Sequence, residues 1–316
     1  MRNNISPIVE GGLLAAVSVV LGLGATYLPI IGIAIEFFCA VPFVILTVRQ
    51  GVGKGLTALI VSLMLMAMFM GPLLAARLAL TINICGIILG WCIQKNFSTA
   101  KCFVATFISS VAAQTIAIIF VMAVMGINFT ETQLSLMKES FDQSFQIYES
   151  MGVEKSVIEE SKKQIEPAIQ LISFLVPTIV VLISLINTTA CYLTSKWIFQ
   201  KLRFQFIEAL PKFSEWRFSI FFLYLAAFAI LGTYWGGTRN WNLIYVVSLN
   251  ATFLAMGVGL IQGLSVLSFA ADKHNFSKFA RRLAFILIII SPLFLQITSC
   301  IGLFDMIFDY RKKLLS

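Results

Sequence analysis

The sequence predicts an all-α fold, a polytopic transmembrane helix bundle of about eight or nine spans. The first reason is composition: 59% of the 316 residues are hydrophobic and 12% are charged, about half the charged share of a soluble domain. The second is a mean hydropathy of +0.92. The third is that the charges are concentrated between long apolar runs, each of roughly the 20 residues that cross a bilayer as a helix.

Nine apolar runs are long enough to be spans, and turn-forming or basic residues separate them. The first run follows a single arginine, Arg2, and has no small-residue cleavage site after it. We therefore expect an uncleaved first span rather than a removed signal peptide. The expected spans are residues 9–28, 32–48, 54–70, 72–94, 102–127, 168–195, 218–237, 241–270 and 282–304.

Lysine and arginine set the expected orientation, because loops retained in the cytoplasm carry an excess of both. Basic residues concentrate in four loops, at 49–54, 95–101, 196–217 and 273–282. These loops and the N-terminus are therefore expected to be cytoplasmic. With nine spans the basic tail FDYRKK would lie outside, against the same rule, and a half-span or re-entrant turn around Cys300–Gly302 would return it to the inner side. This pattern also accounts for the net charge of +8, so no nucleic-acid partner is expected.

Two connecting segments divide the chain into a domain of six spans, residues 1–195, and a C-terminal part, residues 218–316, with two to three additional helices and a short tail. Residues 131–166 are acidic and are expected outside. Apolar residues recur there at spacings of three and four, which predicts an amphipathic helix: Leu134, Met137, Phe141, Phe145 and Tyr148. Residues 196–217 are basic with interleaved aromatic residues, which favours a cytoplasmic helix lying in the membrane interface, either as a connector or as a docking element.

Catalytic and metal-binding patterns are not recognisable in the sequence. The six cysteines lie within or at the ends of apolar runs without a CxxC pair, and we interpret them as buried small hydrophobic residues. His274 is the single histidine, and the stretch GVGKGL lacks the spacing of a phosphate-binding loop. We expect neither enzymatic activity nor a cofactor.

Apart from Glu10 and Lys54 at span ends, Arg77 and Glu36 are the charged residues within the first six expected spans. Both spans enter from the outer side, which puts Glu36 roughly 6 Å and Arg77 roughly 9 Å deep at 1.5 Å per residue. Such charges normally face the protein interior or water and find a partner, so the two are expected side by side, facing inward. They could form a structural ion pair, or they could line an outward-facing pocket for a polar ligand.

Uncharged polar residues inside the spans are candidates for the same pocket, although each is more commonly a hydrogen-bonding link between helices. Asn83 lies on the same helix as Arg77, about a turn and a half deeper. We include Asn83 and Gln114 with Glu36 and Arg77 as candidate substrate-binding residues. The remaining polar residues of this kind are Asn187, Asn250 and Gln262.

Several segments resemble known families. Over residues 9–195, the segments EGGLLAAVSVVLGLG, LPIIG and VPFVILTVRQGVGKGL resemble the substrate-binding S-components of energy-coupling-factor (ECF) transporters. More closely, VPFVILTVRQG, LPKFSEWRFS and GLFDMIFDYRKK resemble the YybS-like family of uncharacterised bacterial polytopic membrane proteins. The resemblance implies an S-component-like six-helix core in the bacterial cell membrane that binds a small molecule from outside, with energy from separate ATPase and coupling subunits.

The resemblance also implies that the first helix docks a coupling subunit through small residues. Gly11, Gly12, Ala15 and Ala16 form two GxxxA pairs in place of the usual AxxxA pattern. The first functional hypothesis is therefore a transporter-type membrane protein for a small polar molecule whose identity is not predicted. The alternative is a non-transport scaffold or assembly protein of the cell envelope with the same fold.

Overall fold

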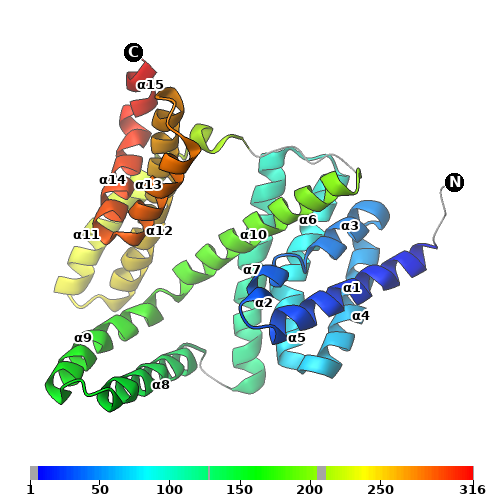
Figure 1. The fold of residues 1–316 in the computed structure, drawn as a ribbon, viewed down its shortest axis with the longest axis horizontal. Coiled ribbons are helices and arrows are strands. Elements are labelled where there is room, and N and C mark those ends of the chain that lie inside the picture. Colours follow the sequence, from blue (N-terminus) through cyan, green and yellow to red (C-terminus); the bar gives the residue numbers. More distant parts are fainter. Residues whose placement is uncertain (1–5, 127–128, 205–210, 316) are drawn as a thin grey trace. The chain divides into compact units, whose positions relative to one another are not determined.

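The computed structural model describes residues 6–126, 129–204 and 211–315. Within these residues every regular element is helical (Figure 1), which confirms the predicted fold class. The chain divides into two compact units. Unit 1 comprises residues 1–151 and 179–210, and unit 2 comprises residues 152–178 and 211–316.

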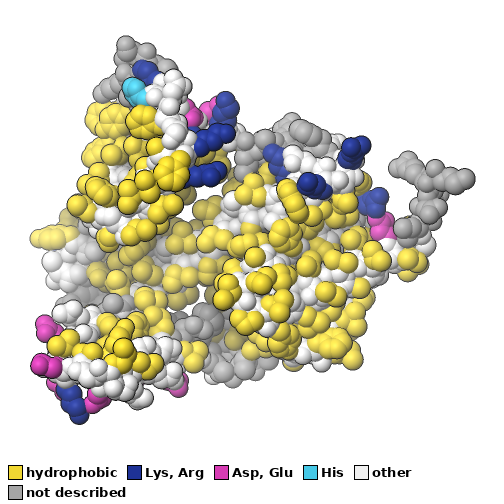
Figure 2. Space-filling view, viewed as in Figure 1, with side chains coloured by type: hydrophobic (Ala, Val, Ile, Leu, Met, Phe, Trp, Pro, Cys, Tyr) yellow, Lys and Arg dark blue, Asp and Glu magenta, His cyan; other side chains and the backbone are white. Residues whose placement is uncertain are grey.

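Eight helical segments of the described chain are long and apolar enough to cross a membrane. The spans follow the predicted ones closely, except that the sixth begins at Val176 rather than at residue 168. Their surfaces carry many exposed large hydrophobic side chains, the yellow areas of Figure 2, as expected of helices that face lipid. The segments are α1 (Pro7–Tyr27), Ile31–Gln50, α4 (Val52–Met70), Pro72–Gln94, α7 (Thr99–Met125), α10 (Val176–Lys201), α11 (Phe221–Thr238) and α12 (Asn242–Lys273).

The ninth predicted span is not one straight helix. Helices α13 (Lys278–Ile290) and α14 (Pro292–Phe308) are bent by 106° at Ser291. The sequence signal is Pro292, which begins α14 and cannot continue a helix from its N-terminal side without losing a hydrogen bond. The expectation of a half-span or re-entrant turn is therefore supported, but the break lies at Ser291 and not around Cys300–Gly302.

Proline and glycine also mark the span boundaries of unit 1. Gly51 ends the second span and Gly71 ends the third, with φ of 87° and 84°. Residues with a Cβ rarely adopt these φ angles. Pro7 and Pro72 each lie in the first turn of a helix, where the missing N–H costs nothing.

Two spans of unit 1 are irregular in ways that the sequence analysis did not anticipate. The second span consists of α2 (Ile31–Glu36), a turn through residues 37–40, and α3 (Val41–Gln50). The fourth consists of α5 (Pro72–Leu78), a π-helical turn, η1 (Ala79–Asn83), and α6 (Ile84–Gln94). The break in the second span directly follows Glu36, and the π-helical turn begins two residues after Arg77.

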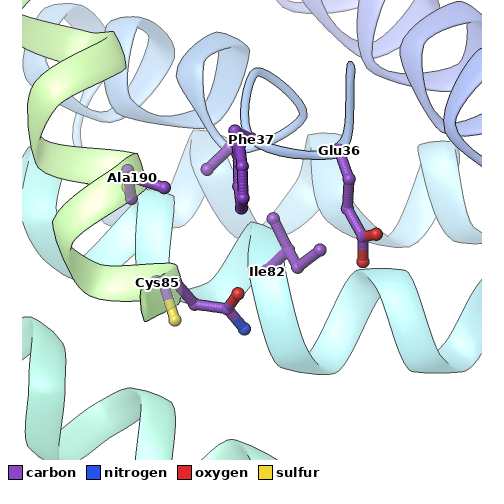
Figure 3. Close-up of a pocket in the computed structure, with 8 residues that line it drawn as sticks. Glu36, Phe37, Ile82, Cys85 and Ala190 are labelled. Atoms are coloured by element: carbon purple, nitrogen blue, oxygen red, sulfur yellow. The ribbon is translucent and has the colours of Figure 1, made fainter. Parts of the chain in front are cut away.

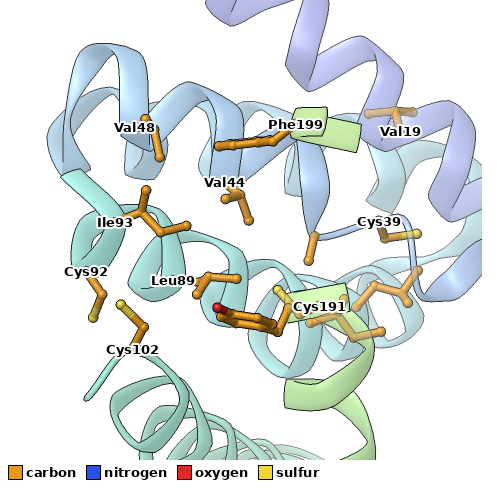
Figure 4. Packing of buried hydrophobic residues seen from close by; sticks show 14 of the residues in the cluster. Val19, Cys39, Val44, Val48, Leu89, Cys92, Ile93, Cys102, Cys191 and Phe199 are labelled. Carbon is orange, nitrogen blue, oxygen red and sulfur yellow. The ribbon is translucent and has the colours of Figure 1, made fainter. Parts of the chain in front are cut away.

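The core of unit 1 is built around α10, which contributes Tyr192 and Phe199, both almost fully buried. These side chains pack in a cluster with Val44 of α3 and Leu89 of α6 (Figure 4). Helices α3 and α6 approach each other closely, because a Cβ on Gly90 would lie 2.8 Å from the carbonyl oxygen of Val44.

The acidic segment forms two helices, α8 (Phe129–Ser150) and α9 (Lys155–Phe174). Helix α8 confirms the predicted amphipathic helix: Phe145 is buried, and Leu134, Met137 and Phe141 are partly buried. Tyr148 is exposed, contrary to the predicted apolar face. Helix α9 continues through Pro167 to Phe174, which explains why the sixth span starts later than predicted.

Residues 196–217 do not form the predicted interfacial helix in their described part. Residues 196–201 complete α10, and residues 211–217 carry only a short 3₁₀ turn, η2 (Phe213–Glu215). The remainder of this prediction, residues 205–210, lies outside the described residues.

Helices α11, α12 and α14 form the centre of unit 2, and small residues let α12 and α14 cross closely. A Cβ on Gly302 of α14 would collide with the backbone of Gly259 in α12. A Cβ on Gly259 would in turn lie 2.6 Å from the carbonyl oxygen of Ser299. After α14 the chain turns at Asp309, in the left-handed region with φ 43°, into α15 (Tyr310–Leu315).

Candidate functional site

The structure places Arg77 beside Glu36, as their depths predicted. Arg77 Nη1 donates to Glu36 Oε1 at 3.1 Å. Glu36 is the last residue of α2, and Arg77 is near the end of α5. The pair therefore joins the broken second span to the irregular fourth span.

The predicted inward orientation of this pair needs correction. The Arg77 side chain is 52% exposed and the Glu36 side chain is 24% exposed. Depth along a helix, which the sequence gives, does not determine which face of the helix a side chain occupies. The carboxylate is thus mostly covered, while the guanidinium lies on the surface of unit 1.

A small cavity opens beside Glu36, between the turn of the second span, the fourth span and α10 (Figure 3). Its volume is about 10 Å³, close to the minimum that holds one water molecule. The lining includes Glu36, Phe37, Ile82, Cys85 and Asn187. Most of these groups are apolar, so the carboxylate and the amide give the cavity its polar character.

The other predicted substrate-binding residues are not brought to this cavity. Asn83 and Gln114 are not among the residues that line it. Asn83 is fully buried, and both atoms of its amide lie without a hydrogen-bond partner among the described residues. Buried amides nearly always form hydrogen bonds, so the Asn83 amide is available to bind a polar group. Gln114 is partly buried in α7.

Asn187 lines the cavity, although the sequence analysis named it only among the polar residues of the spans and did not include it in the substrate-binding set. It lies on α10, opposite the break in the second span, and it is partly buried. Two turns further along α10, the Thr194 hydroxyl lies 3.1 Å from the carbonyl oxygen of Phe37 and 2.7 Å from that of Ala190, and it shares its proton between them. Helix α10 therefore both supports the break and adds an amide to the cavity.

In contrast, Asn250 and Gln262 link helices, which is the general expectation for such residues. Asn250 Nδ2 donates to the carbonyl oxygen of Phe174 at 2.7 Å, and its Oδ1 accepts from the hydroxyl of Thr178 at 2.7 Å. Gln262 Nε2 donates to Asp305 Oδ2 at 2.6 Å. All of these contacts lie within unit 2.

The predicted docking residues of α1 occupy two different faces. Ala15 is 2% exposed and packs in a buried cluster with residues of α3 and α4. Gly12 and Ala16 are exposed, and no atom lies within 4 Å of a Cβ built on Gly12. Gly11 is intermediate, with Leu46 at 3.9 Å from such a Cβ. Only the Gly12–Ala16 face is open to a partner helix.

Unit 2 contains a buried carboxylate–guanidinium pair, which the sequence analysis missed. The side chains of Asp305 and Arg311 are each 3% exposed, with Arg311 Nε 3.9 Å from Asp305 Oδ2. Arg311 also donates to the carbonyl oxygens of Ser214 and Trp216, each at 2.7 Å. Burial lowers the pKa of the Arg311 guanidinium and the neighbouring Asp305 opposes that shift, but an arginine remains charged at neutral pH.

These contacts bear on the side of the C-terminal tail, which the sequence analysis left open between two alternatives. Arg311 and Asp309 contact residues 214–217, which directly precede α11. The tail therefore lies at the same end of unit 2 as the basic 211–217 segment, not at the opposite end. The bend at Ser291 makes this arrangement compatible with the preference of basic tails for the inner side.

The long apolar helices carry few charges, and most charged residues lie in the turns between them. This arrangement defines a polytopic integral membrane protein. The chain belongs to the family described as predicted membrane protein (DUF2232), whose profile matches residues 16–306. It is 26% identical over 315 residues to the uncharacterized protein YybS of Bacillus subtilis (strain 168), an alignment that covers 97% of each chain. No solved structure matches the chain.

Proposed function

We propose that this chain is a transporter-type protein of the cell membrane that binds a small polar molecule in unit 1 for uptake. The observation that carries the proposal is the pair of backbone irregularities beside Glu36 and Arg77. Membrane transporters place substrates at interrupted helices, because a broken span offers free backbone groups within the bilayer. Single π-helical turns are likewise frequent at functional sites.

The polar groups of unit 1 suit a small ligand that carries both charges. Glu36 offers a carboxylate and Arg77 a guanidinium, which together match the two ends of a zwitterion. The amide of Asn187 lines the same cavity. The unpaired amide of Asn83 lies one residue from Ile82 of the cavity wall and could complete the binding site after a small rearrangement.

The cavity volume of about 10 Å³ means that ligand entry requires opening. The Glu36–Arg77 contact closes the break at its outer side, and its exposed guanidinium can leave the carboxylate without crossing a packed core. Energy for uptake would come from separate coupling and ATPase subunits, as in the ECF transporters whose S-components the first six spans resemble. The Gly12–Ala16 face of α1 is the surface for such a subunit.

The binding proposal is tested by native mass spectrometry of the full-length protein in nanodiscs, together with thermal melting against a panel of zwitterionic amino acids and water-soluble vitamins. We expect a retained small molecule or a stabilising compound, and loss of either in Glu36→Leu/Arg77→Met. The matched control is Arg217→Met/Asp309→Leu, which removes an exposed ion pair of unit 2. Equal retention in both double variants, or stabilisation by no member of the panel, would contradict the proposal.

The docking proposal has its own test on α1. Gly12→Leu and Ala16→Leu should each abolish copurification of a partner without lowering the melting temperature. Ala15→Leu, on the buried face of the same helix, should lower the melting temperature instead. Recovery of the same partners by the Gly12 and Ala16 variants would make this face an ordinary lipid-facing surface.

The alternative, a scaffold or assembly protein of the cell envelope, is favoured by one observation: the closed cavity beside Glu36 has no room for a vitamin-sized molecule. Copurification separates the two functions. ATPase and coupling subunits would support transport, whereas cell-wall synthesis or division proteins without any retained ligand would support a scaffold.

A further inference from the structure

Helix α13 differs from every span described above, because it is too short to cross the bilayer and lies at the surface of its unit. Its 13 residues extend about 20 Å at 1.5 Å per residue, against roughly 30 Å of hydrocarbon. None of its residues is buried. Its start is nevertheless well defined, since the Ser277 side chain accepts a hydrogen bond from the backbone N–H of Ala280 at 3.1 Å, a standard N-cap.

The side chains of α13 are basic in the first turn and apolar beyond it. Lys278, Arg281 and Arg282 follow the spacing i, i+3, i+4 and therefore share one face of the helix. An adjacent face is apolar and open, with exposed fractions of 76% for Phe279, 52% for Ile286 and 72% for Ile290. A basic first turn followed by exposed apolar side chains is a composition that suits a helix lying in a membrane interface.

The contacts of α13 place it at the end of unit 2 that carries the basic loops. The Phe285 ring is 6.2 Å from the Phe213 ring of η2, and Arg281 Nη1 is 2.7 Å from Asp272 Oδ1 at the end of α12. The 106° bend to α14 lays α13 close to the membrane plane if α14 stands upright. The basic first turn then lies at the level of the lipid headgroups and the apolar face enters the acyl chains.

We propose that this end of unit 2 is a binding surface for anionic phospholipid headgroups, formed by Lys278 and Arg282 of α13 together with Lys212. These three side chains form no ion pair within the described chain, whereas Arg281 is paired with Asp272. All three are exposed. Lys278 and Arg282 adjoin the apolar residues of α13 that would accompany the lipid tails, and Lys212 directly precedes Phe213, whose ring contacts Phe285 of α13. Clusters of basic residues beside membrane helices bind anionic lipids, because their positive charges attract the negative charge of the lipid headgroups.

The proposal is tested with the full-length protein by native mass spectrometry during titration with phosphatidylglycerol or phosphatidylcholine. Each basic side chain near a membrane surface contributes roughly a fivefold factor in lipid affinity. Lys278→Gln/Arg282→Gln should therefore weaken phosphatidylglycerol binding by about 25-fold. The control Lys162→Gln/Lys163→Gln removes the same charge from α9 and should leave the binding unchanged.

Three results would overturn the proposal. Equal loss of binding in the two double variants would mean that net charge alone attracts the lipid. Equal binding of phosphatidylcholine would remove the requirement for an anionic headgroup. Complete displacement by millimolar inorganic phosphate would make the surface a simple anion site. Phe279→Ser serves as a second variant, because loss of an apolar contact weakens lipid docking but not phosphate binding, and melting curves confirm that each variant is folded.

Discussion

Glu36–Arg77 in unit 1 and Asp305–Arg311 in unit 2 pair the same two chemical groups in opposite environments. In unit 1 the guanidinium is 52% exposed and makes a 3.1 Å hydrogen bond to its carboxylate. In unit 2 both side chains are 3% exposed, their closest approach is 3.9 Å, and the guanidinium donates mainly to backbone carbonyls. A shorter distance therefore does not identify the pair that matters more for stability.

The difference lies in what each pair holds together. The Arg77 guanidinium donates to Glu36, so separating the two residues exposes two groups that can be solvated or can bind a ligand. Arg311 fastens the 214–216 backbone and Ser265 of α12, while Asp305 accepts from Gln262 and from the backbone N–H of Tyr310. The first arrangement can open, whereas the second is a fixed anchor.

The anchor makes an all-or-none prediction about topology. Because Arg311 contacts the 214–216 backbone, a cysteine at Lys312 should label from the same side as one at Lys212, and a cysteine at Lys163 from the opposite side. The measurement is labelling of intact cells with a membrane-impermeant thiol reagent in a background without the native cysteines. Labelling of Lys312→Cys and Lys163→Cys from the same side would contradict the arrangement of unit 2.

The largest effect on stability is expected from Arg311→Met. The substitution leaves the buried Asp305 carboxylate without its cation and two carbonyls without their donor, and removing one partner of a buried pair typically costs about 3–5 kcal/mol. Thermal unfolding of the variant and the parent protein in nanodiscs measures this loss of stability. Lys312→Met is the matched control, because the neighbouring Lys312 side chain is 80% exposed and should leave the melting temperature nearly unchanged.

The double variant Asp305→Leu/Arg311→Met sharpens this comparison. It removes both buried charges and should recover part of the lost stability, but not all, because the carbonyls of Ser214 and Trp216 still lack their donor. A double variant whose loss equals the sum of the two single losses would mean that the two residues do not act as a pair.

A smaller effect is expected from Glu36→Leu and Arg77→Met. If water solvates the exposed Arg77 guanidinium, each substitution should cost about 0–1 kcal/mol, the range of surface pairs. If lipid or protein covers it, the cost should approach the roughly 3–5 kcal/mol of a buried pair, and the double variant should recover most of it. Simple addition of two large losses would show that the residues do not interact.

The sequence predicted the first pair and missed the second for a physical reason. Glu36 and Arg77 are isolated charges in long apolar runs, so their depths could be compared. Asp305 lies one residue beyond the predicted end of the ninth span, and Arg311 lies in a basic tail of the kind that normally faces water. What brings Arg311 back into unit 2 is the left-handed turn at Asp309, a conformation that the sequence DYRKK does not specify.

The same limit applies to the helices. Apolar run length predicted the spans well, because the cost of burying unpaired backbone in lipid enforces continuous helices. It did not predict the turn after Glu36, the π-helical turn after Arg77, or the bend at Ser291. These three irregularities depend on contacts between distant parts of the chain, such as the contact of the Thr194 hydroxyl with the Phe37 carbonyl oxygen. Pro42 and Pro292 were the available signals.

The smallest effect is expected from the ion pair that joins Arg217 to Asp309 at 3.0 Å on the surface of unit 2. Burial tends to raise the pKa of the Asp309 carboxyl, but hydrogen bonds from Arg217 and Lys312 outweigh it and hold the pKa below its ordinary value of 3.8. A lowered pKa stabilises the fold above that ordinary value, and the contribution is lost as pH falls through the pKa of the folded state.

Arg217→Gln should therefore lower the melting temperature slightly at pH 7, less so at high salt because screening weakens exposed pairs, and not at all at a pH where Asp309 is protonated. Melting curves of the variant and the parent protein at two salt concentrations and two pH values measure these differences. A loss as large as that of Arg311→Met, or one that salt does not change, would place this pair with the buried anchor rather than with the surface.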